Sequence, residues 1–186
     1  VIGAPEKLCR TIPDEVSEIM SKGARVIVGG ICRGEITYDN IKVVGMVVIS
    51  DTIRDTANET IKYFYSQDID VKIISGDNPR AVSAVAKNAG VRNAESFIDM
   101  SDVSEDEIND IADKYTVFGR VTPKQKKLLI EAMQNAGHKV AMTGDGVNDL
   151  LAMRRADCSV AMGSGCDAAR RAAQLVLLDS DFSVLK

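Results

Sequence analysis

The sequence predicts an α/β fold in which a parallel sheet is flanked by helices and is preceded by a small α+β unit. From Lys42 onward, short apolar runs alternate with helical segments, which is the pattern of parallel strands joined by crossover helices. The run 43–49 is apolar almost throughout, as in a strand covered on both faces. With 186 residues, 45% of them hydrophobic, the chain is long enough for one substantial core with a small appendage.

The first unit is expected to span residues 1–41. A turn is predicted at 3–6, a helix opens near Pro13 and is stopped by Gly23, and the β-branched run 25–28 predicts a strand that ends at Gly29 and Gly30. Polar and turn-forming residues follow from Gly34 to Asn40. We therefore place a boundary there, so that residues 42–186 form the second unit.

Within residues 42–186 the expected elements alternate in type. Strands are predicted at 43–49, 71–74, 116–118, 139–142, 158–162 and 174–178. Helices are predicted at 55–67, 79–88, 101–114 and 123–134. No repeat or low-complexity tract interrupts this order.

Composition excludes several classes of function. Lys and Arg total 23 against 27 for Asp and Glu, which gives a net charge of −4 and argues against a general nucleic-acid binder or a basic membrane-surface patch. The four cysteines are widely spaced and His138 is the single histidine, so a zinc cluster is not indicated. No apolar run approaches the roughly 20 residues that cross a bilayer. Because the sequence starts at Val1, we expect an excised or recombinant piece.

The stretch 142–149, Met-Thr-Gly-Asp-Gly-Val-Asn-Asp, joins an apolar run to a helical segment. Its two glycines permit a sharp turn, and Asp145 and Asp149 stand four residues apart. Two carboxylates and the Asn148 amide converging there would suit a hard cation such as Mg²⁺. A simple turn with a helix cap uses the same residue types, so from the residues alone both interpretations stay open.

Other polar segments also follow predicted strands. They occupy 51–54, 75–78, 120–124 and 143–149, and such segments meet beyond the carboxyl ends of a parallel sheet. Ser75 and Gly76 offer a hydroxyl and backbone N–H groups to phosphate oxygens, although a turn with an N-cap is the other interpretation. Lys124 opens a helix, where a cation is favoured only beside an anion. A solvated face shared with neighbouring lysines is the alternative.

The run Thr143–Asp149 closely resembles the signature of P-type cation-transporting ATPases, whose catalytic domain has a haloacid dehalogenase-like, Rossmann-type α/β fold. The resemblance continues in order along the chain. Further matching segments are Gly3–Glu6, which resembles the end of a Lys-Gly-Ala motif, Asp51–Arg54, similar to an Asp-Pro-x-Arg element, Ser75–Asn78, similar to a Thr-Gly-Asp motif, Lys124, and Ala161–Gly165.

The resemblance implies a role for each matching residue. Asp145 would bind Mg²⁺, Asn148 and Asp149 would order the site and contact phosphate or Lys124, and Lys124 would neutralise the transferring phosphoryl group. Ser75 with the Gly76 N–H would hold the oxygens of that group, and Asp77 would complete this Ser-Gly-Asp part of the catalytic set. Asp51 and Arg54 would lie near ATP at the domain hinge. Residues 1–41 would be the end of the nucleotide-binding domain, and residues 42–186 the phosphorylation domain.

The departures from the family pattern are equally informative. No Asp-Lys-Thr-Gly-Thr run occurs in the chain, and the spacing of Asp51 and Asp55 does not suit a replacement nucleophile. Ile2 and Thr52 replace a lysine and a proline of the nucleotide-contacting motifs. We therefore expect a soluble cytoplasmic fragment of a membrane-bound pump, inactive alone. Its partners would be ATP and the parent's nucleophile segment, actuator domain and membrane helices.

Two other functions remain open at this point. A free-standing Mg²⁺-dependent haloacid dehalogenase-like phosphatase would require a nucleophilic aspartate of its own, and Asp51 is the residue to test. A non-catalytic module that binds Mg²⁺ or nucleotide would require only the loops. The transported ion is not encoded here, since its ligands would lie in membrane helices; the composition resembles calcium and magnesium pumps more than heavy-metal pumps.

Overall fold

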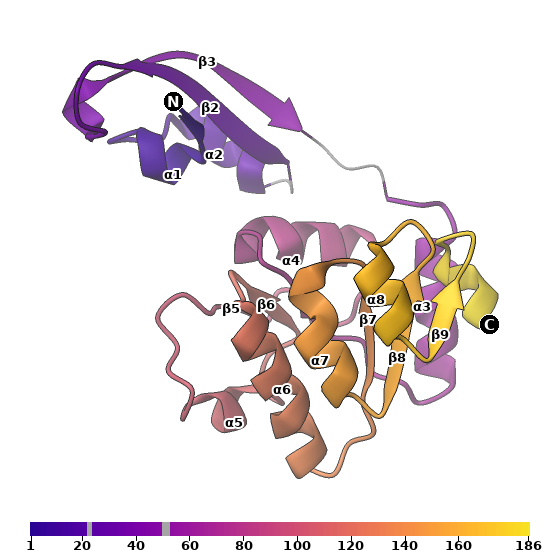
Figure 1. Cartoon of the computed structure of the whole chain (residues 1–186). Coiled ribbons are helices and arrows are strands. Elements are labelled where there is room, and N and C mark those ends of the chain that lie inside the picture. Colours follow the sequence, from indigo (N-terminus) through magenta and orange to yellow (C-terminus); the bar gives the residue numbers. More distant parts are fainter. Residues whose placement is uncertain (22–23, 50–52) are drawn as a thin grey trace.

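The computed structural model describes residues 1–21, 24–49 and 53–186. Its elements form an N-terminal unit and a larger C-terminal unit, which lie on opposite sides in Figure 1. The N-terminal unit contains β1 (Ile2–Gly3), α1 (Pro5–Leu8), α2 (Asp14–Ser21), β2 (Arg25–Cys32), the 3₁₀ turn η1 (Tyr38–Asn40) and β3 (Ile41–Ile49).

The N-terminal sheet is antiparallel, with strand order β1-β2-β3. Val26 and Val28 of β2 are buried, and helices α1 and α2 both lie against this strand. Side chains on β3 such as Val44 and Val47 are largely exposed. One face of this small sheet is therefore packed while the other remains open.

The strand at 43–49 exists but its expected place in the parallel sheet is wrong. β3 pairs antiparallel with β2, so that Val26 lies opposite Val48 and Val28 opposite Met46. A continuous apolar run does not encode the partner of a strand, which long-range pairing decides. The predicted division at residues 41 and 42 stays a prediction about domains, and the pairing shows only that β3 belongs to the first sheet.

β2 also continues through Gly29 and Gly30, where the sequence predicts its end. The register shifts between these two glycines, as in a β-bulge. A Cβ on Gly30 would lie 2.8 Å from the Ile41 side chain. Here glycine permits close approach of the neighbouring strand and does not terminate the element.

The C-terminal unit alternates strands and helices. Its strands are β4 (Ile73–Ile74), β5 (Phe97–Asp99), β6 (Val117–Gly119), β7 (Ala141–Gly144), β8 (Cys158–Met162) and β9 (Leu175–Leu177). Its helices are α3 (Ala57–Ser66), α4 (Pro79–Asn88), α5 (Ile108–Ile111), α6 (Pro123–Asn135), α7 (Leu150–Arg155) and α8 (Asp167–Ala172), with 3₁₀ turns η2 (Val147–Asp149) and η3 (Phe182–Leu185).

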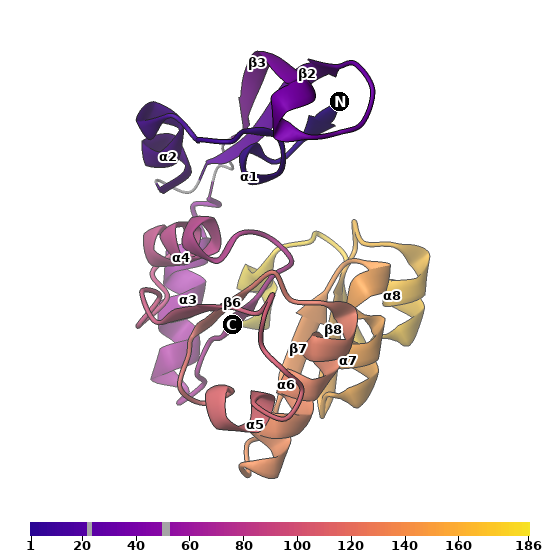
Figure 2. The same ribbon diagram turned by 90° about the vertical axis from the view of Figure 1, so that its left-hand side faces the viewer.

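The strands form two three-stranded parallel sheets, ordered β4-β6-β5 and β7-β8-β9. In Figure 2, α3 and α4 lie on one side of the strands and α6, α7 and α8 on the other. The predicted α/β fold with a parallel arrangement and flanking helices is confirmed. The helix predicted at 101–114 is mostly turn, because Asp99 and Glu107 carboxylates cap nearby N–H groups and only α5 remains helical.

One buried cluster of the core packs on α6 and another packs on α4. Phe118, Ile108 and Leu129 are almost completely buried, and Ile74 packs against both the cluster around Phe118 and the cluster around Met142. β4 and β7 are thus joined through a shared core. Among the described residues, no helix has the length and apolarity to cross a bilayer.

Candidate active site

A cavity of about 340 Å³ opens at the carboxyl ends of β4 and β7. The ends of parallel strands are where ligands bind in open α/β sheets. Backbone and side-chain groups from both sheets, α6 and the C-terminal turn line it: Ile74, Ser75, Gly76, Lys126, Met142, Thr143, Gly144, Asp145, Asp149, Met162 and Phe182. The predicted convergence of the segments after β4 and β7 is therefore found in the structure.

Asp149 holds the loop after β7 in shape. Its Oδ2 accepts hydrogen bonds of 3.2 Å from the backbone N–H groups of Asp145 and Gly146. Its Oδ1 accepts one of 2.6 Å from Nζ of Lys126. The side chain is buried, and a Cβ on Gly144 would come within 2.5 Å of its Cβ. Glycine at 144 is thus required for the close approach of Asp149 to the strand end.

The lysine at this site is Lys126, whereas the sequence predicted Lys124. Lys124 forms an ion pair with Glu105 and keeps 67% of its side chain exposed, while the Lys126 side chain is only 12% exposed. Helix geometry explains the difference. Lys126 precedes the buried Leu129 and Ile130 by three and four residues, so it shares the inward face of α6. That periodicity is the signal in the sequence that identifies Lys126.

The segment after β4 forms the turn and N-cap that its sequence allows, and phosphate binding there stays a prediction. Ser75 Oγ accepts a hydrogen bond of 3.1 Å from the N–H of Asp77, and Asn78 Oδ1 accepts one of 3.0 Å from the N–H of Arg80. These contacts make a turn and cap α4. Ser75 and Gly76 nevertheless line the cavity. An anion bound by Lys126 in this cavity would therefore lie next to the Ser75 hydroxyl and the Gly76 backbone.

Asp145 is the exposed carboxylate of the site. It lines the cavity, and no hydrogen bond or ion pair to another described residue occupies its carboxylate. Asn148 is exposed beside it without lining the cavity. The described residues contain no group of three or more His, Cys, Asp or Glu side chains arranged to hold a metal. Because Mg²⁺ commonly takes one or two protein carboxylates, with waters and phosphate as its other ligands, Asp145 fits as one ligand of such an ion.

A shared two-carboxylate metal site at 145 and 149 does not match the geometry. Both carboxylate oxygens of Asp149 already accept hydrogen bonds, from Lys126 and from two backbone N–H groups. An ionised carboxylate held by a cation and two donors stabilises the loop. Only Asp145 of the pair is therefore free to meet a cation.

A second basic group reaches this region from the N-terminal unit. Nη2 of Arg25, on β2, lies 3.5 Å from Oδ1 of Asp77. Sequence reasoning missed this arginine, because nothing local in a strand residue reveals a partner on a distant loop. Arg54 is exposed and lies near enough to Asp181 for its charge to help lower the pKa of that carboxyl, after the larger effect of the hydrogen bond from the Ser183 N–H. Asp51 falls outside the described residues.

Comparison with known proteins assigns the chain to a family. Residues 3–157 match the family model of haloacid dehalogenase-like hydrolases. The chain is 43% identical over 188 residues to the probable cation-transporting ATPase exp7 of Streptococcus pneumoniae, covering 98% of this chain and 24% of that protein. It is 41% identical over 194 residues to the calcium-transporting ATPase CtpE of Mycobacterium bovis, covering 100% of this chain and 24% of that protein.

A solved structure gives the same fold. The zinc-transporting PIB-type ATPase in its E2.Pi state matches with a TM-score of 0.65 and 24% identity, over 98% of this chain and 25% of that one. The chain thus spans about a quarter of the length of the relatives it matches. The resemblance to P-type cation-transporting ATPases is confirmed, and the chain belongs to the family of haloacid dehalogenase-like hydrolases.

Proposed function

We propose that this chain is the phosphoryl-handling part of a P-type cation-transporting ATPase, with the end of its nucleotide-binding domain attached. In the intact pump, ATP hydrolysis through an aspartyl phosphate drives cation transport across the membrane, and this region lies on the cytoplasmic face. The observation that carries the proposal is the free carboxylate of Asp145 beside the Lys126–Asp149 pair in one cavity with Ser75 and Gly76.

Each group has a distinct part in this proposal. Asp145 supplies a carboxylate to Mg²⁺, which neutralises charge on the phosphoryl group when it is bound. Lys126 places a fixed cation near that group, and Asp149 holds the lysine in position. Ser75 and the Gly76 N–H hold phosphoryl oxygens. Sites of this kind act by positioning and electrostatics.

The N-terminal unit supports the ATP part of the proposal. Arg25 brings a guanidinium to Asp77, in the loop of residues 75–78 between β4 and α4, here called the phosphate loop. Guanidinium groups suit phosphate oxygens, so the triphosphate of ATP would pass from the N-terminal unit toward Ser75. Arg54 and Asp51 remain proposed contacts near the nucleotide. The aspartate that takes the phosphoryl group would come from another segment of the parent pump.

Calorimetric titration of the purified chain tests this assignment. Mg²⁺ is titrated with and without inorganic phosphate into the wild type, Asp145→Ala, Lys126→Met and Lys124→Met. We expect Asp145→Ala to abolish Mg²⁺ binding. Lys126→Met should weaken phosphate binding in the presence of Mg²⁺, and Lys124→Met should not, because its ammonium is paired with Glu105 outside the cavity.

Two results would count against the proposal. Mg²⁺ binding that is equal in the wild type and Asp145→Ala would remove the metal assignment. Robust Mg²⁺-dependent hydrolysis of a generic phosphoester by the isolated chain, lost in Asp51→Asn, would instead show a free-standing phosphatase with its own nucleophile.

A further inference from the structure

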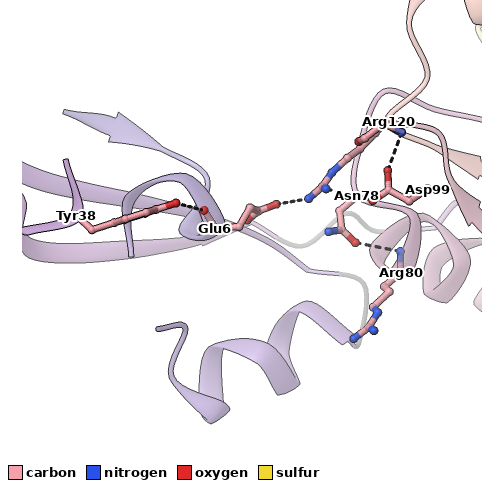
Figure 3. Close-up of polar contacts among 7 residues, drawn as sticks. Glu6, Tyr38, Asn78, Arg80, Asp99 and Arg120 are labelled. Atoms are coloured by element: carbon pink, nitrogen blue, oxygen red, sulfur yellow. Dashed lines mark hydrogen bonds and ion pairs between the residues drawn. The ribbon is translucent and has the colours of Figure 1, made fainter. Parts of the chain in front are cut away.

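One arginine ties the two units together at the edge of the candidate active site. Arg120 follows β6, and its Nη2 lies 2.8 Å from Oε1 of Glu6, on α1 of the N-terminal unit. Its Nη1 lies 3.1 Å from Oδ2 of Asp99, at the end of β5. Figure 3 shows the guanidinium reaching from the C-terminal unit to Glu6. A planar guanidinium suits such two-sided contacts, because its donors point in fixed and different directions.

The backbone of Arg120 is attached to the phosphate loop. Its N–H donates to the carbonyl oxygen of Asp77 at 2.8 Å, and the next N–H, of Val121, donates to the carbonyl oxygen of Ser75 at 3.0 Å. Arg120 has a φ of 54°, an unusual left-handed conformation for a residue with a Cβ. Such a conformation persists where surrounding contacts hold it, and it is common at functional sites.

Asp99 anchors the guanidinium on its own unit. Burial alone would raise the pKa of Asp99, but hydrogen bonds from Ser101 and the charge of Arg120 outweigh that effect and hold its pKa below the usual value. Asp99 therefore stays ionised at neutral pH. Asp99 thus binds Nη1 of the guanidinium, and Nη2 remains available to bind Glu6.

Apolar packing does little to fix the two units relative to each other. None of the three core clusters formed by the described residues includes a residue before Ile61. α2 lies against α4, and the ion pairs between the units that join described residues include Arg25 with Asp77 and Arg120 with Glu6. Interfaces of this polar kind permit relative movement of domains.

Only one oxygen of the Glu6 carboxylate has a partner among the described residues. The carbonyl oxygen of Glu6 accepts a hydrogen bond of 3.3 Å from the Tyr38 hydroxyl, which keeps α1 next to η1. Its Oε2, however, is buried and has no hydrogen-bond partner. A buried acceptor without a donor opposes the contact, which lowers the free energy needed to break the ion pair.

We propose that the Glu6–Arg120 ion pair is a latch that closes the N-terminal unit over the phosphate loop, and that Arg120 is a positioning residue for Ser75, Gly76 and Asp77. When the ion pair forms, it fixes the backbone of Arg120 and Val121, whose N–H groups donate to the carbonyl oxygens of Asp77 and Ser75. It also brings Arg25 to Asp77. The position of the nucleotide-side unit is thereby coupled to the geometry of the phosphoryl site. This inference rests on the proposed function of that loop.

The latch is tested on the whole chain by measuring the distance between the units. Spin labels are attached at Lys42→Cys on β3 and Lys62→Cys on α3, both exposed positions, in a background where the native cysteines are serine. Pulsed electron paramagnetic resonance then reports the distance distribution at low ionic strength, without Mg²⁺ or phosphate. The readout is therefore independent of whether the site binds either ligand.

We expect Glu6→Gln and Arg120→Gln each to lower the ratio of closed to open molecules by about 1.5- to 5-fold, the range for a partly exposed ion pair. The double variant should open no further than either single one, because both remove the same contact. Arg120→Lys should restore part of the closed population. High salt should open the wild type, since it screens partly exposed charges.

Glu131→Gln is the matched control. It breaks a Glu–Arg pair of similar exposure, with Arg155 at 2.9 Å, that lies wholly within the C-terminal unit. Its distance distribution should equal that of the wild type. Distances unchanged in Glu6→Gln, or changed equally in Glu131→Gln, would overturn the latch.

The positioning role has its own readout. The amide resonances of Gly76 and Asp77 should shift in Glu6→Gln and stay in place in Glu131→Gln. Unshifted resonances in an opened Glu6→Gln variant would overturn the positioning of the loop. Failure of Mg²⁺ binding at Asp145 would instead overturn the proposed function. The distance between the units and the amide resonances of Gly76 and Asp77 are measured without Mg²⁺, so they test the latch independently of that result.

Discussion

Nζ of Lys126 lies 2.6 Å from Oδ1 of Asp149, with the two side chains 12% and 10% exposed. The pair joins the first turn of α6 to the loop after β7. One contact therefore fixes both the ammonium group of Lys126 and the backbone around Asp145. Removing either partner leaves a nearly buried charge without its counterpart. The site and the stability of this part of the fold therefore depend on the same interaction.

Lys126→Met should destabilise the protein by about 2 kcal/mol. This lies below the roughly 3–5 kcal/mol for breaking a fully buried pair, because some water still reaches both groups and two backbone donors remain on Asp149. Urea unfolding followed by circular dichroism measures the change. Lys124→Met, which breaks an exposed pair with Glu105, should cost less than about 1 kcal/mol. Equal costs for the two variants would contradict the assignment of Lys126.

Gly144→Ala should disturb the candidate site directly. The new Cβ would lie 2.5 Å from Cβ and 2.9 Å from Cγ of Asp149, so either the loop or the carboxylate must move. We expect a loss of about 1–3 kcal/mol, as for overpacking, and a weaker response to Mg²⁺ in calorimetry.

Gly146→Ala is the control in the same loop. Its Cβ would meet Asp149 Oδ2 at 3.7 Å, an ordinary contact, and its φ of −111° is open to alanine. It should retain nearly the wild-type stability and Mg²⁺ binding. If Gly146→Ala proved as damaging as Gly144→Ala, flexibility of the loop and not crowding at Asp149 would be the cause.

Gly119→Ala tests the contact between β6 and the start of α4. A Cβ at this position would lie 2.5 Å from Cα and Cβ of Pro79, and neither atom can rotate away. Thermal unfolding should show a loss of about 1–3 kcal/mol. Gly45→Ala on β3, where nothing lies within 4 Å of the new Cβ, should have little effect. An unchanged melting temperature in Gly119→Ala would argue against this packing of α4.

Acid should reveal the network around Asp157. The hydrogen bond from Gln134, then those from the Val140 N–H and Lys139, hold the pKa of Asp157 well below its usual value. A depressed pKa in the folded state contributes stability that is complete above the unfolded value of about 3.9 and disappears as pH falls through the folded pKa. The stability advantage of the wild type over Gln134→Ala should therefore shrink as the pH falls below about 4.

Urea unfolding at a series of pH values measures this advantage. Gln125→Ala provides the comparison, because the Gln125 amide donates to the carbonyl oxygens of Met100 and Val103, which do not titrate. Its cost should stay constant across the same pH range. A pH-independent cost for Gln134→Ala would show that its bond to Asp157 does not set that pKa.

Much of the site could be read from the sequence because its parts are local. The motif at 143–149 carries its own turn and its own donors, and the Asp149 carboxylate closes that loop on the N–H groups of Asp145 and Gly146. Helix α4 matches its predicted bounds, since Pro79 and Asn78 specify its start. Alternation of apolar runs and helices is likewise a local pattern, and it predicted the parallel α/β arrangement.

The sequence by itself thus determined the class of fold, the family and the loop that holds Asp145. Only the tertiary structure decided that Lys126 and not Lys124 meets Asp149, that β3 pairs with β2, and that Arg120 reaches Glu6 across the two units. The physical reason is one of range. Periodicity and turn chemistry act over a few residues, whereas the partner of a strand or of a long charged side chain is chosen by packing between segments far apart in the chain.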